Sequence, residues 1–303
     1  MEAGRLRELR VDGGVIRYRE VGTGPAVVFV HGILVNGTLW RDVVARLSGR
    51  FRCIVPDLPL GGHSLPMLPE ADMSPSGVAR MVAELMERLD LRDVTLVGND
   101  TGGAICQVVV SNHPGRIGRL VLTNCDAYES FFPPLLQPIQ YGARLFGPRF
   151  VDLLAWVLRA RVVQRALFKT VAVRNIDKAT LDAYAGRLRG DAHVRRDLAR
   201  FLASVSRRYT LEAARSFPRF DRPVLIAWGD RDPFFSPRLA LRLQHDFPDA
   251  RLEAVVGSRA FVPEDGPERL ARLIQKFCDE PTTPPRGRSP EEVFLEIDTD
   301  CNT

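Results

Sequence analysis

The segment from Val94 to Ala104 constrains the fold of this chain more than any other part of the sequence. It reads as a buried apolar strand, a tight turn and the start of a helix, with Asp100 at the apex of the turn. Gly98 and Gly102 flank the apex, and because they lack a side chain the strand and the helix can approach closely. A carboxylate at such an apex lies beside a helix N-terminus, where it stays ionised and can attack carbon. Direct passage from a strand into a helix is typical of open α/β sheets.

Short strand patterns alternate with helical patterns along the rest of the chain. The expected strands cover residues 6–11, 15–21, 26–30, 51–56, 94–98, 117–123, 223–228 and 252–256, and the expected helices cover 39–47, 75–89, 102–113 and 267–277. The first two strands are joined by Asp12-Gly13-Gly14, which predicts an antiparallel hairpin at the edge of a sheet. The other strands are apolar on both faces. This pattern predicts an α/β fold with a mostly parallel, doubly wound sheet.

Strand patterns are missing between residues 126 and 220, and the apolar residues of this segment follow a helical period. An all-helical insertion of this kind would form a cap over the carboxyl edge of the sheet, where open α/β sheets bind their ligands. We therefore expect a core made of residues 1–125 and 221–280 and a helical cap made of residues 126–220. Residues 281–303 are polar and rich in proline, which predicts a flexible tail.

The composition indicates a soluble protein without a bound metal or cofactor. The 303 residues are 45% apolar, which is enough to bury one large core. Residues 1–20 carry many charges, and the longest apolar run, Leu153–Leu158, is too short to span a membrane, so we expect a cytoplasmic protein. The five cysteines are widely spaced and form no C-x-x-C pair, which predicts neither a disulfide framework nor a metal site. No cofactor is expected, because the turn accounts for the glycines at 98–103.

The charge of the chain is unevenly distributed. The segment from Ala127 to Arg222 holds 18 Lys and Arg against 8 Asp and Glu, an excess of 10, so the rest of the chain has a net charge of 5 minus 10, or −5. This excess either favours an anionic small-molecule substrate or forms a solvated helical face. Aromatic residues do not alternate with the basic ones, so we expect no nucleic acid among the partners, and no membrane either. The sequence does not indicate an oligomeric state.

Four motifs together resemble the α/β-hydrolase superfamily over residues 1 to about 280. They are His31-Gly32-Ile33-Leu34, Asp57-Leu58-Pro59-Leu60-Gly61-Gly62-His63-Ser64, Gly98-Asn99-Asp100-Thr101-Gly102 and Trp228-Gly229-Asp230-Arg231-Asp232-Pro233. The aspartate at the apex resembles the branch of that superfamily with an aspartate nucleophile, which contains haloalkane dehalogenases and soluble epoxide hydrolases. The resemblance implies the α/β-hydrolase fold and an enzyme of the hydrolase type.

The resemblance also implies a role for particular residues. In this branch the aspartate attacks an electrophilic carbon to form an ester, and a water activated by histidine then hydrolyses the ester. By position Asp100 would be the nucleophile and Asp232 the acid that orients the histidine. The backbone N–H groups of Ile33 and Thr101 would form the oxyanion hole. Asp100 could alternatively be a helix N-cap, and Asp232 an ordinary turn residue before Pro233.

Two departures from the family pattern bear on the substrate. Haloalkane dehalogenases typically hold the halide with a tryptophan after the nucleophile and often an asparagine after His-Gly, whereas this chain has Thr101 and Ile33 there. Halide abstraction is therefore disfavoured. Epoxide hydrolases protonate the ring oxygen with tyrosines of the cap. The expected cap contains four tyrosines that could do so, namely Tyr128, Tyr141, Tyr184 and Tyr209.

The third departure concerns the general base. Family members place the histidine just after the last strand, and the matching segment of this chain, Ser258 to Glu268, has Ala260 at that position. The loss of such a base commonly lowers the rate by about 10⁴ to 10⁶, so an ordinary hydrolysis would stop at the ester. The neighbouring Arg259 cannot replace the histidine, because its guanidinium stays protonated.

Three interpretations remain open from the sequence. His63 could serve as a relocated base that is oriented by Asp126, while His31 would shape the turn of the oxyanion hole. Asp100 could instead act as a general base, which would make the protein a lyase, isomerase or cyclase acting on a small, largely apolar molecule. The alternative is a catalytically silent homologue that binds a ligand or a partner in its capped pocket.

Overall fold

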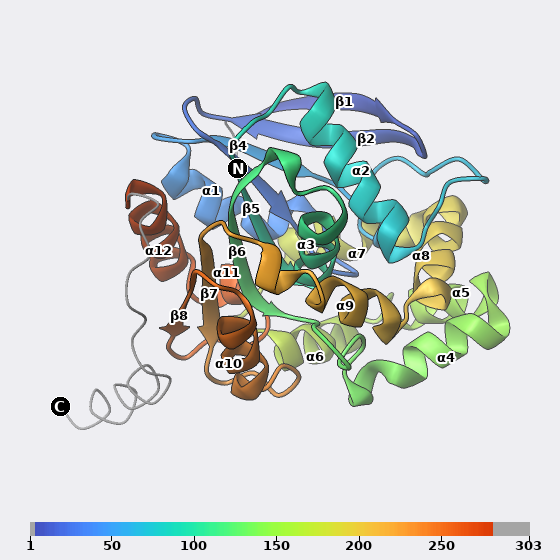
Figure 1. Ribbon diagram of the computed structural model, residues 1–303. Helices are drawn as coiled ribbons and strands as arrows, with labels where there is room; N and C mark the ends of the chain where they lie inside the picture. Colours follow the sequence, from blue (N-terminus) through green and yellow to red (C-terminus); the bar gives the residue numbers. More distant parts are fainter. Residues whose placement is uncertain (1–3, 281–303) are drawn as a thin grey trace.

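The computed structural model describes residues 4–280, which form an eight-stranded sheet flanked by helices (Figure 1). The strand order is β1-β2-β4-β3-β5-β6-β7-β8. The strands are β1 (Arg5–Val11), β2 (Gly14–Val21), β3 (Ala26–Val30), β4 (Arg52–Pro56), β5 (Val94–Asp100), β6 (Ile117–Cys125), β7 (Val224–Gly229) and β8 (Ala250–Val255). Strands β1 and β2 pair antiparallel, β2 pairs antiparallel with β4, and all other neighbours are parallel. The expected α/β-hydrolase sheet is therefore confirmed.

Helices cover both faces of the sheet. Those of the core are α1 (Arg41–Leu47), α2 (Pro75–Arg88), α3 (Thr101–Asn112), α10 (Pro237–Asp246), α11 (Val262–Asp265) and α12 (Pro267–Asp279). Helices α1 and α12 pack together on one face, and α2 packs against α3 on the other (Figure 1). Helix α10 was not predicted. It begins after Ser236 and buries only Ala240 and Leu243 completely, so its apolar pattern is short.

Helix α3 is the most buried helix around the candidate site. Every residue from Thr101 to Val110 is buried, because α3 lies against β5 and is also covered by α2 and by a later helix, α9 (Arg207–Ala214). An apolar surface on all sides fixes the position of a helix from every direction. The first turn of α3, and with it Asp100, is thus held rigidly against the centre of the sheet.

Among the described residues between β6 and β7 there are six α-helices and no strand. Besides α9 they are α4 (Gln137–Phe146), α5 (Pro148–Val157), α6 (Arg161–Val171), α7 (Lys178–Gly190) and α8 (Ala192–Ser204). They contact loops that follow the carboxyl ends of the strands. Asn36, after β3, donates to the carbonyl of Ala183 in α7 at 2.9 Å, and the N–H of Phe261, after β8, donates to the carbonyl of Val171 in α6 at 2.8 Å. The helical segment therefore covers the carboxyl edge of the sheet.

Two further predictions concern a membrane-spanning helix and the tail at the end of the chain. Across residues 4–280, the structure contains no helix with the length and apolar character needed to cross a membrane. The predicted tail at 281–303 lies outside the described residues.

Candidate active site

The turn between β5 and α3 holds Asp100 in a strained backbone conformation. Its φ is 55° and its ψ is −134°, in a region that residues with a Cβ rarely adopt. Gly102 makes the turn possible, because a Cβ at this position would lie 2.3 Å from the carbonyl oxygen of Val30 and 2.5 Å from that of His31. Only glycine lets α3 begin this close to the end of β3. Strain of this kind is commonly retained where a side chain must be presented for chemistry.

The Asp100 carboxylate lies among the groups expected to assist it. The backbone N–H groups of Thr101 and Ile33 lie close enough to lower its pKa, and it makes no side-chain capping bond to α3. The two amides that were predicted as an oxyanion hole thus face the carboxylate of Asp100 itself. Burial raises the pKa of Asp100 to about 7, although the two amides lower it, and the charge of Asp232 adds to the increase. A carboxylate with this pKa can both give and take protons near neutral pH.

Gly32 gives this carboxylate the room it occupies. A Cβ on Gly32 would lie 2.0 Å from Oδ2 of Asp100, so Gly32→Ala must displace the carboxylate from the two amides. We expect this variant to lose activity by about 100-fold or more, since small misplacements of reacting groups cost that much. Gly49→Ala is the matched control, because a Cβ on Gly49 meets no atom within 4 Å. Equal steady-state rates for the two variants would show that the position of the carboxylate does not matter.

Asp126 lies directly after β6 and is completely buried. The Thr101 hydroxyl donates to its Oδ2 at 3.1 Å, and its Oδ1 has no hydrogen-bond partner among the described residues. Burial raises the pKa of Asp126 well above its usual range, and the charge of Asp100 raises it further. Both effects favour the uncharged form of the Asp126 carboxyl, which places less negative charge beside Asp100.

Asp232 follows β7 and is held by two donors. The Asn124 side-chain amide donates to its Oδ2 at 2.7 Å, and the backbone N–H of Phe234 donates to its Oδ1 at 2.8 Å. Burial raises the pKa of Asp232 to about 6, while these hydrogen bonds and the charge of Arg259 lower it. Sequence reasoning missed Asn124, although a polar residue at the end of an apolar strand was a signal that could have found it. Both oxygens of Asp232 are thus oriented without a histidine.

Ala260 is buried near the turn between β5 and α3, which we call the elbow. Its carbonyl accepts a hydrogen bond from the Asn99 side chain at 2.7 Å, which places Ala260 beside the residue that precedes Asp100. Its methyl group cannot exchange a proton. The backbone N–H of Arg259 donates to Asp265 at 2.9 Å, and its guanidinium donates to the carbonyl of Lys169. The side chains at 259 and 260 therefore provide no general base.

The histidines lie elsewhere. All five are within the described residues, where no hydrogen bond links any of them to Asp100, Asp126 or Asp232. His31 donates from Nδ1 to the carbonyl of Gly32 at 2.8 Å, since its Nε2 accepts the N–H of Leu58 at 2.8 Å. Burial lowers the pKa of His31 to about 4. His31 is thus a neutral residue that holds the loop after β3.

His63 does not have the partner that the sequence analysis assigned to it. Its Nε2 lies 3.3 Å from Oδ2 of Asp197 in α8, and its Nδ1 accepts the N–H of Gly61 at 3.3 Å. The pairing with Asp126 is not found among the described residues. Asp197 also accepts the N–H of Met67 at 2.7 Å, so this buried pair fastens α8 to the loop after β4. Both ring nitrogens of His63 are thus hydrogen-bonded to groups other than the three aspartates of the site, which favours a structural role.

The His63→Ala variant distinguishes the two roles. Asp197 would lose His63 but keep its hydrogen bonds from Arg196 and from the N–H of Met67, so we expect the free energy of unfolding to fall by about 1–3 kcal/mol. We expect the rate per folded molecule to stay within about threefold of the wild type, whereas removal of a general base typically costs 10²-fold or more. Urea unfolding and initial rates on the same preparations measure both quantities. A stable variant without activity would restore His63 as a base.

The four cap tyrosines do not form an acid pair in the structure. The hydroxyl of Tyr128 donates to Asp246 at 2.9 Å, and that of Tyr184 donates to Glu264. The hydroxyl of Tyr209 accepts a hydrogen bond from Arg208 at 3.4 Å. Tyr141 is exposed on α4. This arrangement gives no support to protonation of an epoxide oxygen by tyrosines.

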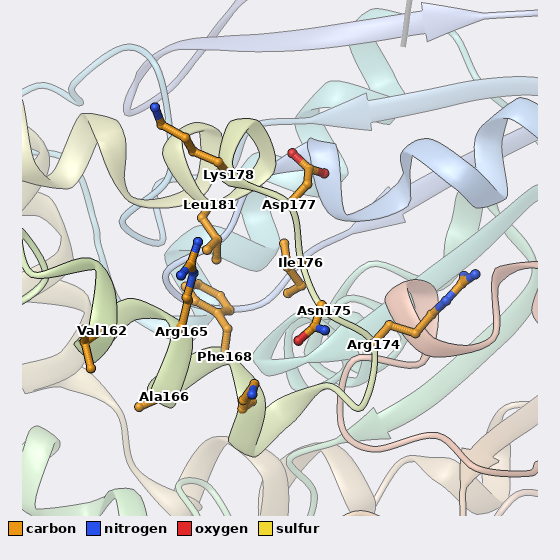
Figure 2. Close-up of a pocket in the computed structure, with 11 residues that line it drawn as sticks. Val162, Arg165, Ala166, Phe168, Arg174, Asn175, Ile176, Asp177, Lys178 and Leu181 are labelled. Carbon is orange, nitrogen blue, oxygen red and sulfur yellow. The ribbon is translucent and has the colours of Figure 1, made fainter.

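A pocket of about 650 Å³ lies between α6 and the start of α7 (Figure 2). Phe168 and Leu181 are its buried apolar floor, and four cationic side chains line it together with one acid, Asp177. The cations are Arg165, Lys169, Arg174 and Lys178. The basic excess found in the sequence thus gathers partly at this pocket. The ring of Phe168 lies 6.2 Å from that of Phe261, so the floor of the pocket contacts the residue after Ala260.

Comparison with known proteins agrees with the fold. The chain is 28% identical to haloalkane dehalogenase 2 of Mycobacterium tuberculosis, over 87% of this chain and 92% of that protein. It is 29% identical to the cis-3-alkyl-4-alkyloxetan-2-one decarboxylase of Xanthomonas campestris pv. campestris, over 84% of this chain and 89% of that protein. The crystal structure of a mutant of the haloalkane dehalogenase DatA from Agrobacterium tumefaciens C58 superimposes with a TM-score of 0.77 at 21% identity. The superposition covers 92% of this chain and 98% of that chain.

The model of the alpha/beta hydrolase fold family matches residues 25–267, which include the elbow, the segment between β6 and β7, and Ala260. The match covers most of the chain and agrees with the order of the parallel strands. The chain therefore belongs to the α/β-hydrolase fold family.

Proposed function

We propose that the protein is an enzyme in which Asp100 attacks an electrophilic carbon of a small, largely apolar molecule and the product leaves without the help of water. One observation carries the proposal. The strained elbow, its two amide donors and the raised pKa of Asp100 are all present, whereas Ala260 stands where the family resemblance implies the base that activates water. A protein that only bound a ligand would need none of the features that present Asp100.

A strained cyclic ester is a substrate that would react in this way. The name of the Xanthomonas campestris relative describes the decarboxylation of an oxetan-2-one, a four-membered ring that is an internal ester. An Asp100 oxygen would form a bond to the alkyl carbon of the ring as the ring C–O bond breaks, which leaves a free carboxylate on the substrate. That carboxylate would then depart as CO₂. The electrons of its C–C bond would form the alkene and expel Asp100 as a carboxylate.

This sequence of steps balances without water and without proton transfer. The ring-opened ester carries a carboxylate, and the excess positive charge of the segment from Ala127 to Arg222 favours an anion at long range. Dehalogenation is less well supported, because Thr101 and Ile33 replace the side chains that hold halide in that branch of the family. Proton abstraction by Asp100 is the related alternative, and it also requires no histidine.

The test uses a cis-3,4-dialkyloxetan-2-one in ¹⁸O-labelled water, with gas chromatography and mass spectrometry of the products. We expect alkene and CO₂ from the wild type, and neither from Asp100→Asn. A labelled 3-hydroxy acid would instead indicate hydrolysis and would contradict the water-independent route. If the lactone binds equally to both proteins and is not consumed, the protein is a binding homologue.

A further inference from the structure

Large exposed hydrophobic residues are concentrated on one part of the cap. Nine of the twelve that occur among the described residues lie between Leu135 and Val173. Five of these nine form what we call the α4–α5 face, which consists of Tyr141, Leu145, Phe146, Leu153 and Trp156. Trp156 is 64% exposed and Leu145 is 76% exposed. Exposure of this many bulky apolar side chains over two short helices marks an interaction surface.

The fold places these side chains on the outside of the molecule. Helices α4 and α5 contact each other, and both pack against α8, so their exposed sides point away from α8. Tyr141 and Leu145 are spaced i, i+4 on α4, and Leu153 and Trp156 are spaced i, i+3 on α5, which puts each pair on one side of its helix. In Figure 1 the two helices form a protruding edge of the cap. The face is therefore accessible to a flat partner.

The charges beside this face are positive. Arg149 and Arg159 are exposed at the two ends of α5, and neither has an ion-pair partner among residues 4–280. Asp152, the acid of α5, is paired with Arg195. Contact of this face with a second copy would bring arginines together without acidic partners, which disfavours a homodimer. An anionic surface would instead attract them.

We propose that the α4–α5 face docks on an anionic lipid bilayer. Trp, Phe and Leu side chains would enter the region between headgroups and acyl chains, and Arg149 and Arg159 would contact the lipid phosphates. The proposal departs from the sequence-based expectation of no membrane contact, because the sequence excluded a span and did not reveal the exposed faces. It does not depend on the proposed reaction, although a bilayer would also concentrate an apolar substrate.

Tryptophan fluorescence provides a specific readout. The chain has three tryptophans, and Trp40 and Trp228 are completely buried, so a change in emission on docking reports on Trp156. We expect a blue shift and co-sedimentation when the full chain is mixed with vesicles that contain about one-third phosphatidylglycerol. Vesicles of phosphatidylcholine alone should bind about tenfold or more weakly, and added salt should weaken binding to the anionic vesicles.

Two sets of variants test the apolar residues of the α4–α5 face and the neighbouring arginines separately. The double variant Leu145→Ser/Phe146→Ser should abolish the blue shift. The control Leu68→Ser, which replaces an exposed leucine far from α4 and α5 in the sequence, should keep it. Arg149→Glu with Arg159→Glu should weaken binding to anionic vesicles by about tenfold or more. The proposal is wrong if the wild type stays in the supernatant with unchanged emission. It is also wrong if sedimentation velocity finds a dimer that the Leu145 and Phe146 variant dissociates.

Discussion

Asp100→Asn should lower kcat by about 10³-fold or more and make the folded protein more stable at pH 8. The loss of activity follows because an amide cannot attack carbon or accept the proton that Asp100 would take. The gain in stability follows from the raised pKa of Asp100. That carboxyl group ionises near pH 7 in the folded protein and near 3.9 in an unfolded chain, so above pH 7 its charge opposes folding.

The pH dependence of Tm tests whether the charge of Asp100 destabilises the folded protein. The stability associated with a protonated Asp100 is fully present below about pH 4 and is lost as the pH rises through about 7. The variant should therefore raise Tm by about 3–6 °C at pH 8 and hardly change it at pH 4. Asp182→Asn is the matched control. The pKa of Asp182 is lowered to about 2 by Arg161 and Arg189, so its replacement should lower Tm at pH 8. A Tm at pH 8 that is lower for Asp100→Asn than for the wild type would contradict the raised pKa of Asp100.

Ala260→His should introduce water-dependent turnover that the wild type lacks. The new imidazole would lie near the elbow, where Asp232 is already held by Asn124 and Phe234 and could orient it. We expect the rate of hydrolysis of an ester on Asp100 to rise by about 10²-fold or more, because general-base catalysis typically contributes that much. Incorporation of ¹⁸O from labelled water into the product measures the change.

Ala260→Gln controls for the size of the new side chain. Ala260 is buried, so both substitutions must find space at the same position, but glutamine cannot act as a base. Equal ¹⁸O incorporation by the two variants would refute the account of position 260, provided that both melt cooperatively. A gain confined to histidine would show that the missing base limits the wild-type protein.

The sheet was predictable because its parallel strands are buried on both faces. An uninterrupted apolar run such as that of β5 or β7 signals a central strand without any knowledge of its neighbours. The Asp100 turn was predictable for a related reason, since Gly98 and Gly102 mark close approaches. The structure places Gly102 against the carbonyls of Val30 and His31, and Gly98 against Gly103 in the first turn of α3. Local patterns therefore determined the scaffold and the apex of the site.

The pairings across the chain were not predictable from local patterns. His63 meets Asp197, which is 134 residues away, and only the packing of α8 on the loop after β4 brings them together. The raised pKa of Asp126 results from its complete burial beside Asp100, and no spacing in the sequence reveals burial of that kind. The exposure of Trp156 follows from the packing of α5 on α8, which the apolar pattern alone did not distinguish from a core position.

Intact-protein mass spectrometry tests the central role of Asp100 most directly. The wild type and Asp100→Asn would be incubated with an alkyl sulfonate, which needs no halide site and leaves no carboxylate that could depart as CO₂. We predict one persistent adduct of the alkyl mass on the wild type, mapped by peptide sequencing to Asp100 and missing from the variant. An adduct that forms equally on both proteins, or free alcohol released without a detectable ester, would contradict the account.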